Sequence, residues 1–194
     1  MAVLLALLRP LEWVNDLALK VGRAIATAAI ALMVVCILVQ VFFRYVLNNA
    51  LPWPEEAARF LMLWMTGLIA PSAYRRGGFV AIDMLLMMLP RTMGAVVSLA
   101  LLLLSTLVLV MGLQLGMKHI NSGWMFASST LYLPLELIGQ KGYKIKLAWM
   151  YMSLYVGLWL LLMVNVELVL RALIGMFGGD DRLRPLIEET LVVE

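Results

Sequence analysis

Four stretches of this chain are almost purely apolar, and each is about as long as a membrane is thick. They lie at residues 24–43, 57–74, 92–117 and 147–168. The only charged residues inside them are Arg59 and Glu167, and both lie near an end of their stretch. An α-helix rises about 1.5 Å per residue, so roughly 20 apolar residues cross a hydrocarbon core of about 30 Å. We therefore predict an all-α integral membrane protein with four transmembrane helices.

The overall composition excludes several classes of protein. Of the 194 residues, 64% are hydrophobic and 14% are charged, whereas soluble domains have about 45–50% and about 25%. A soluble fold of this size still exposes roughly 30% of its surface, so it could not hide this excess. A soluble enzyme, a nucleic-acid-binding protein and a disordered chain are therefore excluded. The single Cys36 and single His119 also exclude an internal disulfide, a cysteine-rich metal site and a haem held by two histidines, and we expect no cofactor.

Two further segments have the pattern of helices that lie along the membrane surface. In residues 1–23 charged side chains recur at helical spacing opposite apolar ones, as in an amphipathic interfacial helix. Residues 79–89 carry only Asp83 as a charge and are too short to cross the membrane, so they should lie along its surface or pack on another subunit. We expect three parts: a horizontal helix at 1–23, a transmembrane domain at 24–170 that includes the arm at 79–89, and a polar tail at 171–194.

The positively charged residues near the ends of the apolar stretches predict the orientation in the membrane. Cytoplasmic flanks of transmembrane helices carry an excess of Lys and Arg. The N-terminus, the second connection and the C-terminus hold nine such residues, and the opposite side holds six. This bias predicts that both termini are cytoplasmic. The nine are Arg9, Lys20, Arg23, Arg75, Arg76, Arg91, Arg171, Arg182 and Arg184, and the six are Arg44, Arg59, Lys118, Lys141, Lys144 and Lys146.

Polar residues gather around the connection between the first two apolar stretches. Pro54 suits the first turn of a helix, and Glu55 and Glu56 lie where the positive end of the helix dipole favours acids. Arg59 is close enough in sequence to pair with either acid. One interpretation is a capped helix start with Trp53 in the aromatic belt at the membrane boundary. The other is a polar cluster of Arg44, Glu55, Glu56 and Arg59 that joins the first two helices or contacts a partner.

The third apolar stretch carries small residues at a regular interval. Ser98, Ser105 and Gly112 recur every seven residues, and such a row lets another helix approach closely. The approaching helix is either another helix of this chain or a helix of a partner subunit, and the sequence leaves both open. At the end of the fourth stretch, Glu167 and Arg171 have the i, i+4 spacing of a local ion pair.

The central parts of the four stretches lack the residues that transport or catalysis would use. Ion-coupled pathways contain ionisable residues within the membrane or broken helices at its midplane, and here Pro71 is the only helix breaker. An independent four-helix channel or exporter remains the alternative, and it predicts conductance or export without a partner. A membrane enzyme would have to use His119, Asp83 or Glu167, and their spacing indicates no catalytic arrangement. We therefore do not expect an enzyme.

The segment from Arg44 to Pro90 resembles a known family. It contains Arg44-Tyr45, then Trp53-Pro54-Glu55-Glu56 with Arg59 and Trp64, then Arg75, Gly77 to Asp83, and Leu89-Pro90. This order and spacing is similar to that of the DctQ-like small membrane subunits of tripartite ATP-independent periplasmic (TRAP) transporters. Phe79 stands where that family usually has a histidine. The length and the four-helix layout agree over the whole chain.

The resemblance implies a role in a larger assembly in the bacterial inner membrane. Such a subunit pairs with a large DctM-like membrane subunit that holds the sodium and substrate sites and moves as an elevator. A periplasmic binding protein delivers organic acids such as carboxylates. The small subunit would then be a fixed scaffold whose interfacial helices contact membrane lipids. The expected structural or subunit-interface residues are Arg44, Trp53, Glu55, Glu56, Arg59, Trp64, Arg75, Arg76, Asp83, Ser98, Ser105 and Gly112, and those expected to dock the binding protein are Lys141, Lys144 and Lys146.

Overall fold

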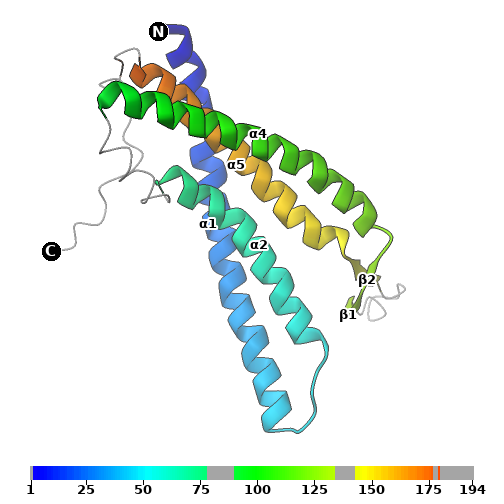
Figure 1. Ribbon diagram of the computed structural model, residues 1–194. Coiled ribbons are helices and arrows are strands. Elements are labelled where there is room, and N and C mark those ends of the chain that lie inside the picture. The colour runs from blue at the N-terminus through cyan, green and yellow to red at the C-terminus, as the bar shows by residue number, and fades with distance from the viewer. Residues whose placement is uncertain (1, 78–89, 134–142, 177–178, 180–194) are drawn as a thin grey trace, which may run out of the picture.

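Four long helices and one short β-hairpin form the structure, a computed structural model that describes residues 2–77, 90–133, 143–176 and 179 (Figure 1). The helices are α1 (Ala2–Tyr45), α2 (Trp53–Arg75), α4 (Arg91–Gly123) and α5 (Ala148–Met176), and the strands are β1 (Ala127–Leu133) and β2 (Tyr143–Lys146). The expected arm at 79–89, with Asp83, lies outside the described residues, as do Lys141 and most of the expected tail, whose first residues, 171–176, belong to α5.

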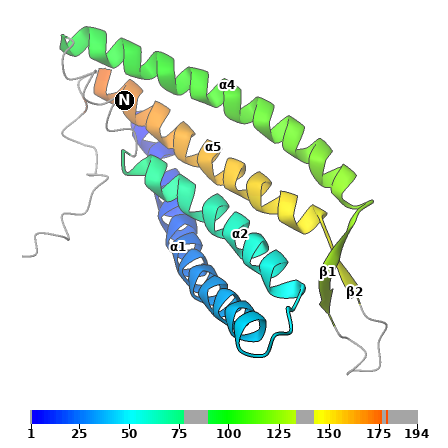
Figure 2. The same cartoon turned by 60° about the horizontal axis from the view of Figure 1, so that its bottom comes forward.

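The helices form two antiparallel pairs that are joined through α5. α1 pairs with α2, α4 pairs with α5, and α5 also packs against both α1 and α2. Figures 1 and 2 show the start of α1, the end of α2, the start of α4 and the end of α5 at one end of the molecule. The α1–α2 connection and the hairpin lie toward the other end. Each helix therefore runs the length of the bundle once.

Two helix backbones approach closely where α2 crosses α5. A Cβ atom added to Gly157 would lie 2.7 Å from the carbonyl oxygen of Gly67, and one added to Gly67 would lie 2.5 Å from the carbonyl oxygen of Ser153. Both distances are too short for a carbon atom that is not bonded to the oxygen. Small residues at these positions therefore allow the two backbones to touch, as is common between membrane helices.

α1 continues through Arg23 without a break, so the N-terminal segment and the first apolar stretch form one helix. Its 44 residues correspond to about 66 Å at the usual rise per residue. Glu12 and Asn15 are buried against the bundle, whereas Leu7 and Val14 are exposed. Glu12 and Asn15 have partners on other helices of the protein, and the apolar side chains of this segment are divided, with Leu8 buried and Leu7 facing outward. The position of this segment along the membrane surface stays a prediction.

Within the part of the chain that the structure describes, three helices are long and apolar enough to cross a membrane: α1, α4 and α5. α2 is not among them. Its composition is less apolar because it contains Glu55, Glu56 and Arg59 in its first turns and Arg75 in its last. Pro71 lies within α2 and does not end it. The membrane crossing expected at residues 57–74 therefore stays a prediction.

The third connection contains a β-hairpin that the all-helical expectation missed. β1 and β2 are antiparallel, with Ala127 opposite Lys146, Leu133 opposite Tyr143, and an irregularity in the register between them. Leu133 is the last residue of β1. The residues of β1 from Ser128 to Tyr132 are polar or common in strands. Their backbone N–H and C=O groups are not part of a helix, so they need other partners, and β2 supplies them.

Candidate functional site: a charge cluster shared by three helices

The most extensive polar arrangement centres on Glu167, whose side chain is fully buried. Its Oε1 atom accepts hydrogen bonds from Nη2 of Arg75 at 2.7 Å, from Nε of Arg75 at 3.1 Å and from Nε of Arg171 at 3.1 Å. Its Oε2 atom accepts a hydrogen bond from Nδ2 of Asn15 at 2.7 Å. A buried carboxylate is costly unless it is paired, and here donors from α1, α2 and α5 surround it.

Two acids of α1 complete this arrangement. Nη2 of Arg171 lies 2.6 Å from Oε1 of Glu12, and Nη1 of Arg75 pairs with Asp16. Each arginine therefore binds one carboxylate on α1 and shares Glu167 on α5. Because all members belong to one connected network, we call them the charge cluster. Its residues are Glu12, Asn15 and Asp16 of α1, Arg75 of α2, and Glu167 and Arg171 of α5.

Local sequence explains why the charge cluster forms at this end of the bundle. Glu12, Asn15 and Asp16 are three and four residues apart, so they share one face of α1. Glu167 and Arg171 share one face of α5 for the same reason. Arg75 is the last residue of α2, so its long side chain reaches both helices. The result is a three-way joint that holds α1, α2 and α5 at a fixed position.

A second polar contact lies two residues before Glu167 on α5. Asn165 is fully buried, and its Nδ2 atom donates to Oγ1 of Thr106 at 2.7 Å and to the carbonyl oxygen of Leu102 at 3.1 Å, both on α4. Its Oδ1 atom accepts a hydrogen bond from the hydroxyl of Tyr74 on α2. Asn165 therefore joins α2, α4 and α5, and with the charge cluster all four helices are linked by side-chain hydrogen bonds.

The four residues expected to cluster at the first connection do not all meet. Glu55 and Arg59 form an exposed ion pair within α2. The guanidinium of Arg44 lies 5.8 Å from the centre of the neighbouring Tyr45 ring. Glu56 instead contacts β1, where it accepts hydrogen bonds from the hydroxyl of Thr130 and, at 3.2 Å, from the backbone N–H of Thr130.

Glu56 lies just before the second predicted transmembrane stretch, and its pKa is lowered. Partial burial raises the pKa of this carboxyl, but hydrogen bonds from the side chains of Thr130 and Ser128 and from the backbone of Thr130 and Leu131 outweigh that effect. Ser128 is itself buried and accepts a hydrogen bond from the backbone N–H of Leu131 at 2.8 Å. The ionised form of Glu56 therefore holds the hairpin against the start of α2.

Two of the three small residues that recur every seven positions in α4, Ser105 and Gly112, lie against other helices of this chain. A Cβ atom added to Gly112 would lie 3.4 Å from the side chain of Leu158 on α5. Ser105 lies within hydrogen-bonding reach of the Tyr74 side chain. Ser98 is half-buried.

The remaining expected residues are scattered. Trp53 and Arg76 are exposed, and so is Lys144 on β2, while Lys146 is half-buried. The indole N–H of Trp64 is buried and has no hydrogen-bond partner among the residues that the structure describes. Of the expected interface residues, only Arg75 belongs to the charge cluster.

Sequence reasoning missed the partners of Arg75 and the role of Asn165. The spacing of Glu12 and Asp16 fits the polar face of a surface helix equally well, so the sequence alone does not place them against the other helices. Asn165 was the clearer signal, since it is an amide within an apolar stretch, where polar side chains normally need a partner. In the described ranges, no group of three or more side chains of His, Cys, Asp or Glu could hold a metal ion. The charge cluster pairs its acids with arginines, which is chemistry that joins helices.

Comparison with known proteins identifies the family. No curated protein matches this chain in sequence. A family model does match, over residues 33–175, and its description is "Tripartite ATP-independent periplasmic transporters, DctQ component". The matched range includes the end of α1, all of α2, α4 and the hairpin, and nearly all of α5. Because it covers most of the chain, this protein belongs to the DctQ component family of tripartite ATP-independent periplasmic transporters.

Proposed function

We propose that this chain is the scaffold subunit of a TRAP transporter, which anchors a large membrane subunit while that subunit moves substrate. Membership of the DctQ family makes the chain a membrane component of such a transporter. The charge cluster is the observation that carries the scaffold role. It places Arg75, Glu167 and Arg171 against one another in the interior, where they hold helices together.

The outer surface of α4 supports the same role. α4 packs mainly on α5, and its opposite side is apolar and exposed over at least three turns. The residues on that side are Leu104, Val108, Met111 and Leu115, which recur at helical spacing. α1 also exposes apolar side chains along much of its length, including Leu38 and Val41. These surfaces suit contact with lipid and with the apolar helices of a larger membrane subunit.

Co-purification and cross-linking test this proposal. We expect the tagged chain to isolate a large multi-span subunit encoded with it. A photo-cross-linking residue at Val108 or Leu38 should capture that subunit, whereas one at the buried Asn165 should not. Uptake of substrate should require both subunits and the binding protein. Uptake by this chain alone, or export without a partner, would contradict the scaffold role and favour an independent channel or exporter.

The periplasmic binding protein is proposed to dock at the hairpin. β2 carries Lys144 and Lys146, and Glu56 fixes β1 to the start of α2. A positive edge on a fixed hairpin suits a partner with an acidic surface. Reversing both charges, K144E with K146E, should raise the concentration of binding protein needed for half-maximal uptake. The matched control is K20E on α1. Lys20 is four residues after Asp16 of the charge cluster and so lies away from the hairpin. Unchanged uptake kinetics in the double variant would remove the docking role.

The orientation, substrate class and coupling ion follow the family resemblance. We propose a bacterial inner-membrane location with both termini cytoplasmic, sodium coupling, and an organic acid as substrate. The start of α1 and the end of α5 lie at the same end of the bundle (Figure 1), which fits termini on one side. A reporter that is active only in the cytoplasm should be active when it is fused after Glu194. A reporter that is active only in the periplasm should be inactive there. Dependence of uptake on a sodium gradient tests the coupling.

A further inference from the structure

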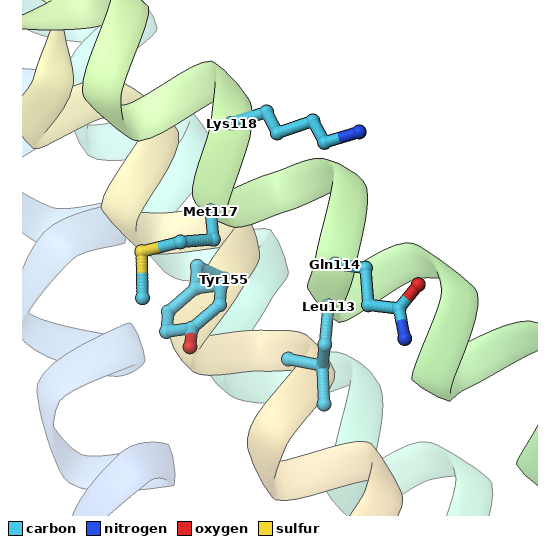
Figure 3. A pocket seen from close by; sticks show the side chains of 5 residues that line it. All are labelled: Leu113, Gln114, Met117, Lys118 and Tyr155. Carbon is cyan, nitrogen blue, oxygen red and sulfur yellow. The ribbon is translucent and has the colours of Figure 1, made fainter.

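An open groove runs along the contact between α4 and α5. Its volume is about 550 Å³, and it is lined by Leu113, Gln114, Met117, Lys118 and Tyr155. Figure 3 shows Lys118 and Gln114 pointing to the same side of α4, while Tyr155 of α5 lies between Met117 and Leu113. The groove therefore has an apolar floor and a polar edge with one positive charge.

Small residues on α4 create this floor. A Cβ atom added to Gly116 would lie 3.2 Å from Cδ2 of Tyr155, so the tyrosine ring lies directly on the glycine. Leu158, one turn further along α5, lies on Gly112 in the same way. The ring of Tyr155 is thereby held close to α4, and the side chains of Leu113 and Met117 extend past it. The groove is a consequence of how these two helices pack.

Lys118 has no anionic partner within the groove. It forms no ion pair in the part of the chain that the structure describes, and α4 contains no Asp or Glu. The only acid of α5 is Glu167, which is about 18 Å from Tyr155 along the helix and already binds Arg75 and Arg171. An anion that pairs with Lys118 has to come from outside these two helices.

The position of the groove along the bundle matches the boundary of a membrane. Trp124 and Trp149 lie just beyond it, with ring centres 6.3 Å apart, and both are exposed. Tryptophans concentrate at the level of lipid headgroups. Lys118 is six residues before Trp124, or about 9 Å deeper. A lysine at this depth extends its flexible stem toward the headgroups, while the groove floor stays at the level of acyl chains.

We propose that this groove binds one anionic phospholipid. Its phosphate pairs with the ammonium of Lys118 and accepts a hydrogen bond from the amide of Gln114. One acyl chain lies against Leu113, Met117 and Tyr155. The charge of Lys118 favours an anionic headgroup over a zwitterionic one, and the apolar floor favours a lipid over a small anion. This site is separate from the scaffold role and does not depend on it.

Native mass spectrometry of the full chain in detergent tests the site, with phosphatidylglycerol and phosphatidylcholine added separately. One lysine near a membrane surface contributes roughly a fivefold preference for anionic lipid. We expect the wild type to bind phosphatidylglycerol about fivefold more tightly than phosphatidylcholine. K118Q should lose that preference, K118R should keep it, and K144Q, the matched control on the hairpin, should keep it as well. L113W, which fills the groove, should reduce binding of both lipids.

Three results would overturn the lipid site. An unchanged preference in K118Q would show that the charge of Lys118 is not used, and an equal loss in K144Q would show a general charge effect. Competition by glycerol 3-phosphate at the same concentration as phosphatidylglycerol would indicate a site for a free anion. In the intact transporter complex, a photo-cross-linking residue at Gln114 that captures the large subunit in place of lipid would identify a protein as the occupant.

Discussion

Nη2 of Arg75 lies 2.7 Å from Oε1 of Glu167, although the two residues are 92 positions apart in the chain. The contact joins the last residue of α2 to a fully buried carboxylate of α5. Where water is excluded, two opposite charges attract each other more strongly. Taking each charge out of water costs free energy, however, and this cost can exceed the gain. The arrangement is favourable because Glu167 also binds Arg171 and Asn15, so removing one member leaves the others with unpaired charge.

The first prediction is that Glu167→Gln strongly destabilises the chain. The amide keeps the size of the side chain but leaves Arg75 and Arg171 without their shared negative partner. Breaking a buried ion pair from one side costs about 3–5 kcal/mol, and we expect a loss near the lower end of that range because Glu12 and Asp16 remain. Thermal unfolding of the purified protein in detergent, followed by circular dichroism, measures the loss.

Glu55→Gln is the matched control for that variant, because it removes the same charge from an exposed pair with Arg59. Exposed pairs contribute about 0–1 kcal/mol, so the unfolding temperature of this control should hardly change. Equal effects of the two substitutions would contradict a special role for Glu167. The comparison also separates loss of the charge cluster from a general effect of removing an acid.

The second prediction concerns the crossing of α2 and α5. In Gly157→Ala the new methyl carbon would lie 2.7 Å from the carbonyl oxygen of Gly67, so the helices have to separate. Overpacking of this kind costs about 1–3 kcal/mol. Gly112→Ala is the control, because its methyl group would meet only the flexible side chain of Leu158 at 3.4 Å. Distances between spin labels on α2 and α5 should increase in the first variant and not in the second.

Hydropathy and spacing identified much of the helical architecture from the sequence alone. α1 and α4 include the stretches expected at 24–43 and 92–117, and α5 covers all of 147–168 except its first residue, because long apolar runs have few alternatives to membrane helices. The local pair of Glu167 with Arg171 was also predicted, since both lie on one helix face. Such features depend on neighbours within about four residues, which a sequence displays directly.

The charge cluster could not be predicted because it depends on contacts between distant segments. The spacing of Glu12 and Asp16 fits a surface helix and an inward-facing polar stripe equally well. Only the packing of α1 on α5 decides between them, and it buries Glu12 while exposing Leu7. The hairpin was missed for a similar reason: the pairing of β1 with β2, and the contact of Thr130 with Glu56, depend on where α2 begins in space.

The third prediction is a pH dependence of the hairpin contact. The pKa of Glu56 is lowered in the folded protein, so its contribution is present above the pKa of the unfolded chain. That contribution is lost as the pH falls through the lower folded pKa, which places the change below the ordinary pKa of a glutamate, about 4.3. We expect the hairpin to move away from α2 in that acidic range.

A fluorophore at Lys144 and a quencher at Trp53→Cys report this movement. Quenching in the wild type should decrease on acidification, whereas Glu56→Gln should show weaker quenching at neutral pH and no further change. Glu55→Gln, one residue earlier and outside the hairpin contact, should behave as the wild type. A wild-type acid transition that persists in Glu56→Gln would assign the pH dependence to another group.

The fourth prediction is that Asn165 positions α4. Asn165→Leu removes two hydrogen bonds to α4 and one from Tyr74 of α2, while its size stays similar. Hydrogen bonds between membrane helices average about 0.6 kcal/mol and reach about 1.7 kcal/mol, so we expect a loss of about 1–2 kcal/mol. Asn121→Leu on the exposed part of α4 is the control, and it should change the stability of the protein little.

In a double-mutant cycle, Thr106→Val should cost much less in the Asn165→Leu background than in the wild type, because both substitutions remove the same hydrogen bond. Additive losses would mean that Asn165 stabilises the protein through contacts other than Thr106.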